Sequence, residues 1–292
     1  MKECLLCGAT FSGMSWECPS CRCSPKQNGE CLVFSPELAD TNDGFERTHF
    51  ERLSCLEAKH FWFESRNLLI LWALQHYFPK GDNFLEIGCG TGFVLSAVER
   101  NFPSYALYGS EISTTGLPFA KRRLKEAHLF QMDARQIPFK EEFNIIGAFD
   151  VLEHIAEDEF VLSQIHKALV DGGGLILTVP QHPFLWSYWD EISHHKRRYT
   201  RSELRKKMEV AGFKVLWMTS FMALLLPALM ALRLKWRERD IPIKKSEELK
   251  DLDLPPWLNS CFRKVCEIEG RIVKRGFSLP AGGSLLCVAL KE

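Results

Sequence analysis

Residues 83–92 read Asn-Phe-Leu-Glu-Ile-Gly-Cys-Gly-Thr-Gly, a short apolar segment that runs into a glycine-rich turn. The apolar segment is typical of a buried strand, and the apolar spacing of residues 93–100 predicts a helix directly after the turn. Glycine at positions 88, 90 and 92 permits backbone angles and a close approach of ligand that a Cβ atom would prevent. The stretch predicts a nucleotide site, although its G-x-G-x-G spacing differs from the G-x-G-x-x-G that cradles a pyrophosphate.

A carboxylate follows this turn about one helix–strand unit later in the sequence. Glu111 ends the next expected strand, residues 105–111, where nucleotide-binding α/β folds place an acid for the ribose hydroxyls. The alternative is that Glu111 simply starts a helix and that Asp133, further along, caps a turn. The ordered spacing of these residues favours a ligand site.

The segment 85–92 resembles the first motif of class I S-adenosylmethionine-dependent methyltransferases, in which an acid between two hydrophobic residues precedes G-x-G-x-G. The resemblance continues in the family's order with Glu111, Met132-Asp133-Ala134 and the segment 149–154. By this analogy Glu86 orders the glycine loop near the cofactor amine, and Asp150 lines the methionine end. The implied cofactor-binding residues are Glu86, Gly88, Cys89, Gly90, Thr91, Gly92, Glu111, Ile112, Asp133, Ala134 and Asp150.

The remaining pattern alternates strands with helices, which predicts a parallel sheet. The resemblance implies a doubly wound α/β fold with a seven-stranded sheet of methyltransferase type, whose last two strands form an antiparallel hairpin. We expect a strand at 144–149, a helix at 157–169, a sharp reversal at 171–174 and a further strand at 175–179. A helix at 201–211 and the hairpin strands 213–218 and 284–290 are expected to follow.

Two C-x-x-C pairs lie near the N-terminus, and this spacing lets each pair offer two thiolates to one tetrahedral ion. A segment this short needs metal ligation to fold, so residues 1–35 are expected to form a structural zinc ribbon. Free or redox thiols and an iron site are the alternatives, and Cys23 or Cys31 could replace a ligand. The expected ligands are Cys4, Cys7, Cys18 and Cys21.

The segment 181–199 follows the fifth strand, where open α/β sheets place ligand-contacting loops. It resembles the segment ending in a histidine and an Arg-Tyr pair in a methyltransferase branch that acts on small-molecule, lipid-linked or glycan-type acceptors. His195 is the first candidate general base, with His154 and Asp190 behind it. Arg198 and Tyr199 are candidate substrate contacts, Arg198 for an anionic group. The alternative is that His195 and Arg198 only hold the loop on the sheet.

Aromatic residues precede the cofactor motif at positions 60–67, ahead of a helix expected at 68–78. Similar stretches occur before the glycine loop in the same branch. Trp62 and Arg66 are therefore further candidate substrate contacts. The simpler interpretation is an aromatic lid packed on the sheet.

Residues 215–232 form an 18-residue run without charge, long enough to cross a bilayer. Its first part is needed as a strand, however, and Pro227 lies near its middle. Residues 221–282 are therefore expected to be an apolar helical insertion before the last strand. It could be an interfacial hairpin or substrate cap that meets a membrane through 221–239, a buried core insertion, or a true span.

Charge and composition limit the function classes. Lys and Arg total 37, as do Asp and Glu, so no global field attracts nucleic acid or an acidic partner. No secretory signal is visible, which favours the cytoplasm with possible membrane association. The expected organisation is a zinc ribbon at 1–35, a methyltransferase domain at 45–220 and 283–292, and the insertion at 221–282.

The sequence predicts methyl transfer from S-adenosylmethionine to a small-molecule, lipid-linked or glycan-type acceptor, at oxygen. One alternative is an RNA methyltransferase, because a zinc ribbon can contact nucleic acid and residues 121–123 and 196–198 are basic. Balanced charge counts against it. The other alternative is a noncatalytic scaffold that keeps its cofactor and binds a partner protein through the ribbon.

Overall fold

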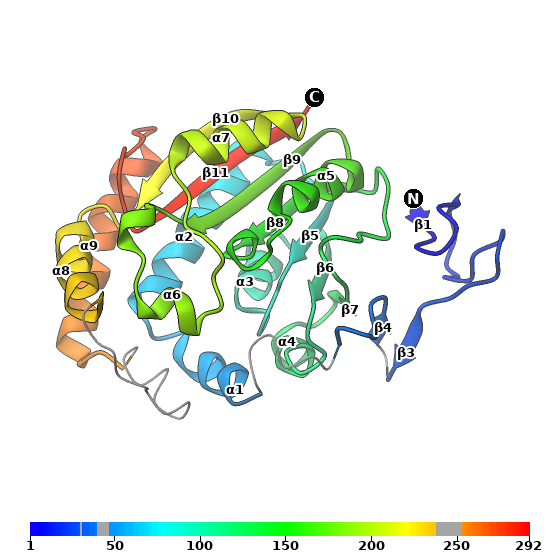
Figure 1. Cartoon of the computed structure of the whole chain (residues 1–292), viewed down its shortest axis with the longest axis horizontal. Helices are drawn as coiled ribbons and strands as arrows, with labels where there is room; N and C mark the ends of the chain where they lie inside the picture. The colour runs from blue at the N-terminus through cyan, green and yellow to red at the C-terminus, as the bar shows by residue number, and fades with distance from the viewer. Residues whose placement is uncertain (30, 40–46, 238–252) are drawn as a thin grey trace.

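A mixed nine-stranded β-sheet forms the centre of the molecule (Figure 1). The computed structural model describes residues 1–29, 31–39, 47–237 and 253–292, with the backbone alone at 234–237. The strands of this sheet are β3 (Lys26–Asn28), β4 (Cys31–Val33), β5 (Asn83–Ile87), β6 (Ala106–Glu111), β7 (His128–Gln131), β8 (Phe143–Phe149), β9 (Leu169–Pro180), β10 (Phe213–Phe221) and β11 (Ser284–Lys291). Their order across the sheet is β10-β11-β9-β8-β5-β6-β7-β4-β3.

Seven of these strands confirm the expected doubly wound arrangement. β5 pairs in parallel with β6 and β8, β6 with β7, and β8 with β9. β11 is antiparallel to both β9 and β10, so the expected terminal hairpin is present. The carboxyl ends of the parallel strands therefore meet at one edge of the sheet, where α/β folds bind ligands.

Helices cover both faces of the sheet, so its strands are apolar on both sides. On β8, Ile145 packs with the helices of one face and Ile146 with those of the other, as the two-residue period of a strand requires. One face carries α2 (Phe61–Tyr77), α3 (Phe93–Asn101), α4 (Leu117–Arg123) and α9 (Pro256–Lys274), and the other carries α5 (Asp158–Ala168) and α7 (Arg201–Val210).

Two sequence expectations about element boundaries were wrong. The expected sharp reversal at 171–174 lies inside β9, where the pairing with β8 shifts between Phe143 and Ile145 and the extra residues form a bulge. Gly172 adopts the left-handed φ of 71° that this irregularity needs. The helix expected at 68–78 includes the aromatic stretch before it, because α2 already begins at Phe61 with His60 as its N-cap.

The N-terminal segment is joined to the main sheet. β1 (Lys2–Glu3) and β2 (Thr10–Phe11) form a small hairpin, but β3 and β4 extend the large sheet through parallel pairing of β4 with β7. Trp16 packs edge-on against Phe34 and Phe139, with ring centroids 4.7 and 5.4 Å away. The cysteine segment is thus anchored at one end of the sheet (Figure 1).

The insertion between β10 and β11 lies at the opposite end of the sheet (Figure 1). It contains α8 (Leu226–Arg237) and α9, and α9 packs along α2, where Arg263 forms a 2.7 Å ion pair with Glu64. None of the helices in the described ranges is long and apolar enough to cross a bilayer. Residues 238–252 of the insertion and the expected domain start at residue 45 lie outside the described residues.

Candidate active site

The glycine loop joins β5 to α3 with three left-handed residues. Gly88, Gly90 and Gly92 have φ values of 67°, 53° and 75°. A Cβ at Gly88 would lie 2.6 Å from Val151 Cγ2, and one at Gly92 would lie 3.0 Å from Ala120 Cα, so packing of the protein itself requires glycine there. A Cβ at Gly90 would meet no atom within 4 Å. Gly90 therefore presents open space at the N-terminal end of α3, which is where a ligand would lie.

Glu111 closes this loop from the end of β6. Its carboxylate accepts hydrogen bonds from the backbone N–H of Gly90 and of Ile112, both at 2.9 Å, and from Ser113 N–H at 3.3 Å. Burial raises the pKa of Glu111, and the three backbone donors oppose that rise. The carboxylate expected to bind a ribose therefore faces the glycine loop.

Glu86 lies inside β5 beneath the loop and is 2% exposed. Burial raises its pKa well above the usual range, although Arg66 opposes this. Within the described residues its Oε2 has no hydrogen-bond partner. Such an orphaned buried carboxylate oxygen is what a cationic ligand group would satisfy.

Arg66 and Asp150 form an ion pair beside the loop. The Arg66 guanidinium also lies 4.6 Å from the centroid of the Trp62 ring. Asp150 has a left-handed φ of 57°, directly after β8. Trp62 and Arg66 were expected to contact substrate, and the structure places them next to the predicted methionine end of the cofactor.

A supporting network behind the loop was missed by the sequence analysis. Thr91 Oγ1 donates to Glu57 Oε2 at 2.6 Å, and Arg123 Nη1 contacts Glu57 Oε2 at 2.6 Å and Thr91 Oγ1 at 2.8 Å. Glu57 directly follows α1 (Arg47–Leu56) and Arg123 ends α4. No local pattern links these three positions, since only the fold brings them together.

The other expected cofactor residues lie around the same strand ends. Asp133 follows β7, and its carboxylate accepts from the Arg135 backbone at 2.9 Å and from Arg135 Nε at 3.0 Å. Cys89 and Ala134 are buried, whereas Ile112 is 36% exposed. The structure thus brings the second and third family motifs to one edge of the sheet.

On the acceptor side, Asp190 of α6 (Tyr188–Ile192) is the centre of a charged network. Its carboxylate contacts His195 Nδ1 at 3.0 Å and Arg198 Nε and Arg233 Nη1 at 2.7 Å each. Burial alone would raise the pKa of Asp190, but His195 and the two guanidinium groups hold it well below its usual range. No pattern in the sequence indicated that Arg233 of α8 would contact Asp190.

Glu153, His154 and His195 form a second group, called here the acceptor cluster. One ligand atom from each residue lies within 4.8 Å of the others, and the two imidazole ring centroids are 4.8 Å apart. Glu153 and His154 belong to a 3-10 turn, Leu152–His154, after β8. Burial, followed by the nearby His195 and His194, lowers the pKa of His154 to about 3, so its ring is neutral.

Two expected substrate contacts point into the protein. Arg198 pairs with Asp190 and donates from Nη1 to the carbonyl oxygen of Gln181 at 2.6 Å. Tyr199 is fully buried, and its hydroxyl donates to Asp158 Oδ2 at 2.7 Å. These contacts favour the alternative in which Arg198 holds the loop on the sheet. Tyr199 has no exposed surface to offer a substrate.

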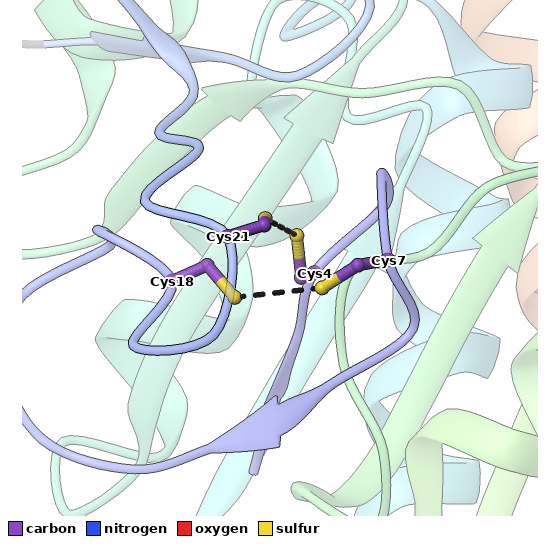
Figure 2. A group of neighbouring side chains, drawn as sticks. All are labelled: Cys4, Cys7, Cys18 and Cys21. Carbon is purple, nitrogen blue, oxygen red and sulfur yellow. Dashed lines mark hydrogen bonds between the residues drawn. The ribbon is translucent and has the colours of Figure 1, made fainter.

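The four expected cysteine ligands converge at the N-terminus (Figure 2). The sulfur atoms of Cys4 and Cys21 are 3.5 Å apart, and those of Cys7 and Cys18 are 3.6 Å apart. The two C-x-x-C segments form matching turns. Gly8 N–H donates to the carbonyl oxygen of Cys4 in the first turn and Arg22 N–H to that of Cys18 in the second, both at 2.8 Å. The set fits one tetrahedral ion. Among the described residues, Cys23 and Cys31 lie outside this cluster.

The doubly wound sheet, the left-handed glycine loop and the facing acid after the next strand define a methyltransferase fold of class I. The sequence matches the methyltransferase domain family over residues 57–217, which is more than half of the chain. The chain therefore belongs to this family, whose class I members use S-adenosylmethionine.

Individual relatives support the same placement. The mitochondrial ubiquinone biosynthesis O-methyltransferase of Candida albicans is 31% identical over 108 residues, which are 35% of this chain and 33% of the relative. Phosphoethanolamine N-methyltransferase 2 of Haemonchus contortus, solved with S-adenosyl-L-methionine, superposes with a TM-score of 0.56 at 16% identity. That match covers 87% of this chain and 59% of the nematode protein. The chain thus spans less than two thirds of these relatives' length.

The fold itself does not fix the reaction. The [4+2]-cyclase SpnF superposes with a TM-score of 0.51 at 20% identity, covering 79% of this chain and 81% of the cyclase. Function must therefore be argued from the site.

Proposed function

We propose that this chain transfers a methyl group from S-adenosylmethionine to a hydroxyl oxygen of a small-molecule, lipid-linked or glycan-type acceptor. The main support is the 2.9 Å contact between Gly90 N–H and the Glu111 carboxylate, which places an acid directly against the open face of the loop. An open backbone turn and a carboxylate are what a nucleoside needs at its sugar.

The residues of the site fit S-adenosylmethionine. Glu111 would bind the ribose, and the loop at Gly90 would admit the nucleoside against the backbone. Glu86, buried with an orphaned oxygen, would face the cationic methionine end together with Asp150. When bound, the cofactor supplies an already activated methyl group, so alignment of the acceptor provides much of the rate.

An oxygen acceptor must also lose its proton, and activation of the hydroxyl depends on His195. Ionised Asp190 only accepts hydrogen bonds, so His195 donates to it from Nδ1, and in the neutral imidazole Nε2 is then the nitrogen that can accept the hydroxyl proton. Arg198 and Arg233 keep Asp190 ionised and thereby orient His195. These arginines act as positioning residues.

The names of similar proteins support an acceptor of low molecular weight. The Candida relative is a ubiquinone biosynthesis O-methyltransferase and the Haemonchus neighbour a phosphoethanolamine N-methyltransferase. The two names differ in the acceptor atom. The His195–Asp190 pair favours oxygen, because an amine that is already neutral needs no base.

The test is transfer of labelled methyl from S-adenosylmethionine into an extract separated into lipid, small-molecule and RNA fractions. We expect label in the lipid or small-molecule fraction. His195→Ala should lower kcat by about 100-fold or more while the cofactor affinity stays unchanged. His194→Asn, an exposed neighbour whose left-handed φ of 56° asparagine tolerates, is the matched control. Label in RNA alone, or normal turnover of His195→Ala, would contradict the proposal.

We also propose that the N-terminal cysteine cluster binds a structural zinc ion through Cys4, Cys7, Cys18 and Cys21. With four thiolates and no position for water, the ion would stabilise the segment without taking part in transfer. Metal analysis should find one zinc per chain and its loss in Cys18→Ser, with the exposed Cys55→Ser as control. Zinc retained by Cys18→Ser would exclude this ligand set.

For a lipid-linked acceptor, we propose that α8 contacts the membrane surface. It and the preceding turn expose the apolar side chains of Leu224, Met230 and Leu232. Flotation with phosphatidylcholine–phosphatidylglycerol vesicles should recover the protein, and Leu232→Ser should weaken recovery more than Phe160→Ser, an exposed apolar residue of α5. Failure of the wild-type protein to float would remove the membrane contact.

A further inference from the structure

The acceptor cluster has the composition and geometry of a metal site. We propose that Glu153, His154 and His195 bind one divalent transition-metal ion such as Mn²⁺ or Fe²⁺. Two imidazoles and one carboxylate form a facial ligand set that leaves further coordination positions open. Because the three ligand atoms lie within 4.8 Å of one another, some point lies within about 3 Å of all of them. Shifts of less than about 1 Å would bring them to metal-bonding distance.

Glu153 provides an independent reason for a cation here. Its side chain is 1% exposed, and neither carboxylate oxygen has a hydrogen-bond partner in the described part of the chain. A buried carboxylate without partners is costly unless it is paired or ligates a metal. The charge of Asp150 repels that of Glu153, and the two guanidinium groups that attract it, Arg66 and Arg198, already pair with Asp150 and Asp190.

Both histidines make a further hydrogen bond of the kind that metal-ligating histidines make in proteins. Ligating imidazoles usually donate their other N–H to a carboxylate or a backbone carbonyl, which fixes the ring. His195 has this contact with Asp190 at 3.0 Å, and His154 has a hydrogen bond with the backbone of Ser193. The two rings stand at 78° to each other, so their nitrogens can approach one ion from different directions.

This site differs in chemistry from the cysteine cluster. Four thiolates select soft ions such as zinc, whereas imidazole and carboxylate ligands suit Mn²⁺ and Fe²⁺. Because their ligands prefer different metal ions, the two sites can be loaded and measured separately in one chain.

The ion would deepen the proposed function, and this part rests on it. A coordinated acceptor hydroxyl loses its proton more readily, because the cation stabilises the oxyanion. The proton leaves to solvent water, the oxyanion attacks the methyl carbon, and the carbon–sulfur bond breaks to release S-adenosylhomocysteine. His195 would then act as a ligand, and the acceptor class would be a hydroxyl compound able to coordinate the ion.

The experiment is a Mn²⁺ titration of the zinc-loaded full chain followed by electron paramagnetic resonance. We expect one bound Mn²⁺ per chain, with nitrogen hyperfine couplings from two imidazoles. Glu153→Gln and His195→Ala should each weaken Mn²⁺ binding by about 10- to 100-fold, and His194→Asn should leave it unchanged. Binding without nitrogen couplings, or binding unaffected by Glu153→Gln, would overturn the proposal.

Two further readouts separate this inference from the proposed function. Calorimetry with S-adenosylmethionine should give the same affinity for Glu153→Gln as for wild type, which also checks that the variant folds. The nitrogen couplings are measured on the wild-type protein and need no variant. Methyl transfer that continues unchanged after a chelator removes Mn²⁺ would reject the metal role and leave the transferase intact. Mn²⁺ binding without transfer would reject only the transferase.

Discussion

The glycine loop and the acceptor cluster lie at the same edge of the sheet but are built differently. The loop is one contiguous stretch, 88–92, and the contacts of Glu111 are all with backbone N–H groups. The acceptor side combines side chains from the turn after β8, from α6 and the loop after it, and from α8. A site made from backbone is visible in local sequence, whereas one made from distant side chains depends on the packing of the whole chain.

The two regions also differ in charge. At the loop, burial raises the pKa values of Glu86 and Glu111, and cationic partners are few. On the acceptor side, His195 and two arginines hold the pKa of Asp190 low despite its burial. The loop is therefore prepared for a ligand cation, while the network around Asp190 is already satisfied within the protein.

The largest effect is expected from Asp190→Asn. It leaves the buried guanidinium groups of Arg198 and Arg233 without a counter-ion, which should lower the free energy of unfolding by about 3–5 kcal/mol. Urea denaturation measures this, with the exposed Glu191→Gln as control.

The depressed pKa of Asp190 also predicts a pH dependence. Asp190 stabilises the fold above the ordinary carboxyl pKa, and this contribution is lost as the pH falls below it. The variant should therefore lose less stability in acid than wild type. Equal stability of the two proteins at neutral pH would refute the network.

A smaller and more specific effect is expected from Gly90→Ala. Gly90 and Gly172 are both left-handed, with φ values of 53° and 71°, and a Cβ at either would meet no atom within 4 Å. Alanine should cost about 1–2 kcal/mol of stability at both positions. Only Gly90→Ala should also weaken S-adenosylmethionine binding, by about 100-fold, or about 2.7 kcal/mol. Similar cofactor affinities in the two variants would show that the ligand does not lie against Gly90.

The smallest effect is expected from Trp62→Phe. The cation–π contact with Arg66 should weaken by about 0.5–1 kcal/mol, a change of a few-fold in cofactor affinity measured by calorimetry. Trp72→Phe, in the same helix but stacked on His76, should leave that affinity unchanged. A change in the control as large as that in Trp62→Phe would assign the effect to the helix as a whole.

Sequence alone predicted the contiguous parts of this protein. The glycine loop, the acid at 111 and the two cysteine pairs each depend on short spacings. The alternation of strands and helices predicted a parallel sheet, and the resemblance to class I methyltransferases implied its seven-stranded form. The sequence did not predict β3 and β4, because each strand has only three residues, β3 is polar throughout, and β4 pairs with β7, which is distant in the sequence. Nor could it predict that Arg233 reaches Asp190, or that Glu57 and Arg123 hold Thr91. Those contacts join residues 32 to 66 positions apart, so no local pattern encodes them.

Calorimetric titration of the zinc-loaded chain with S-adenosylmethionine, for wild type and Glu111→Ala, tests the cofactor assignment. We predict one cofactor bound per wild-type chain. Removing the carboxylate should weaken binding by about 100-fold, since hydrogen bonds to a charged group contribute about 1.5–3 kcal/mol each. No binding by wild type, or the same affinity in both proteins, would contradict a nucleoside held between the glycine loop and Glu111.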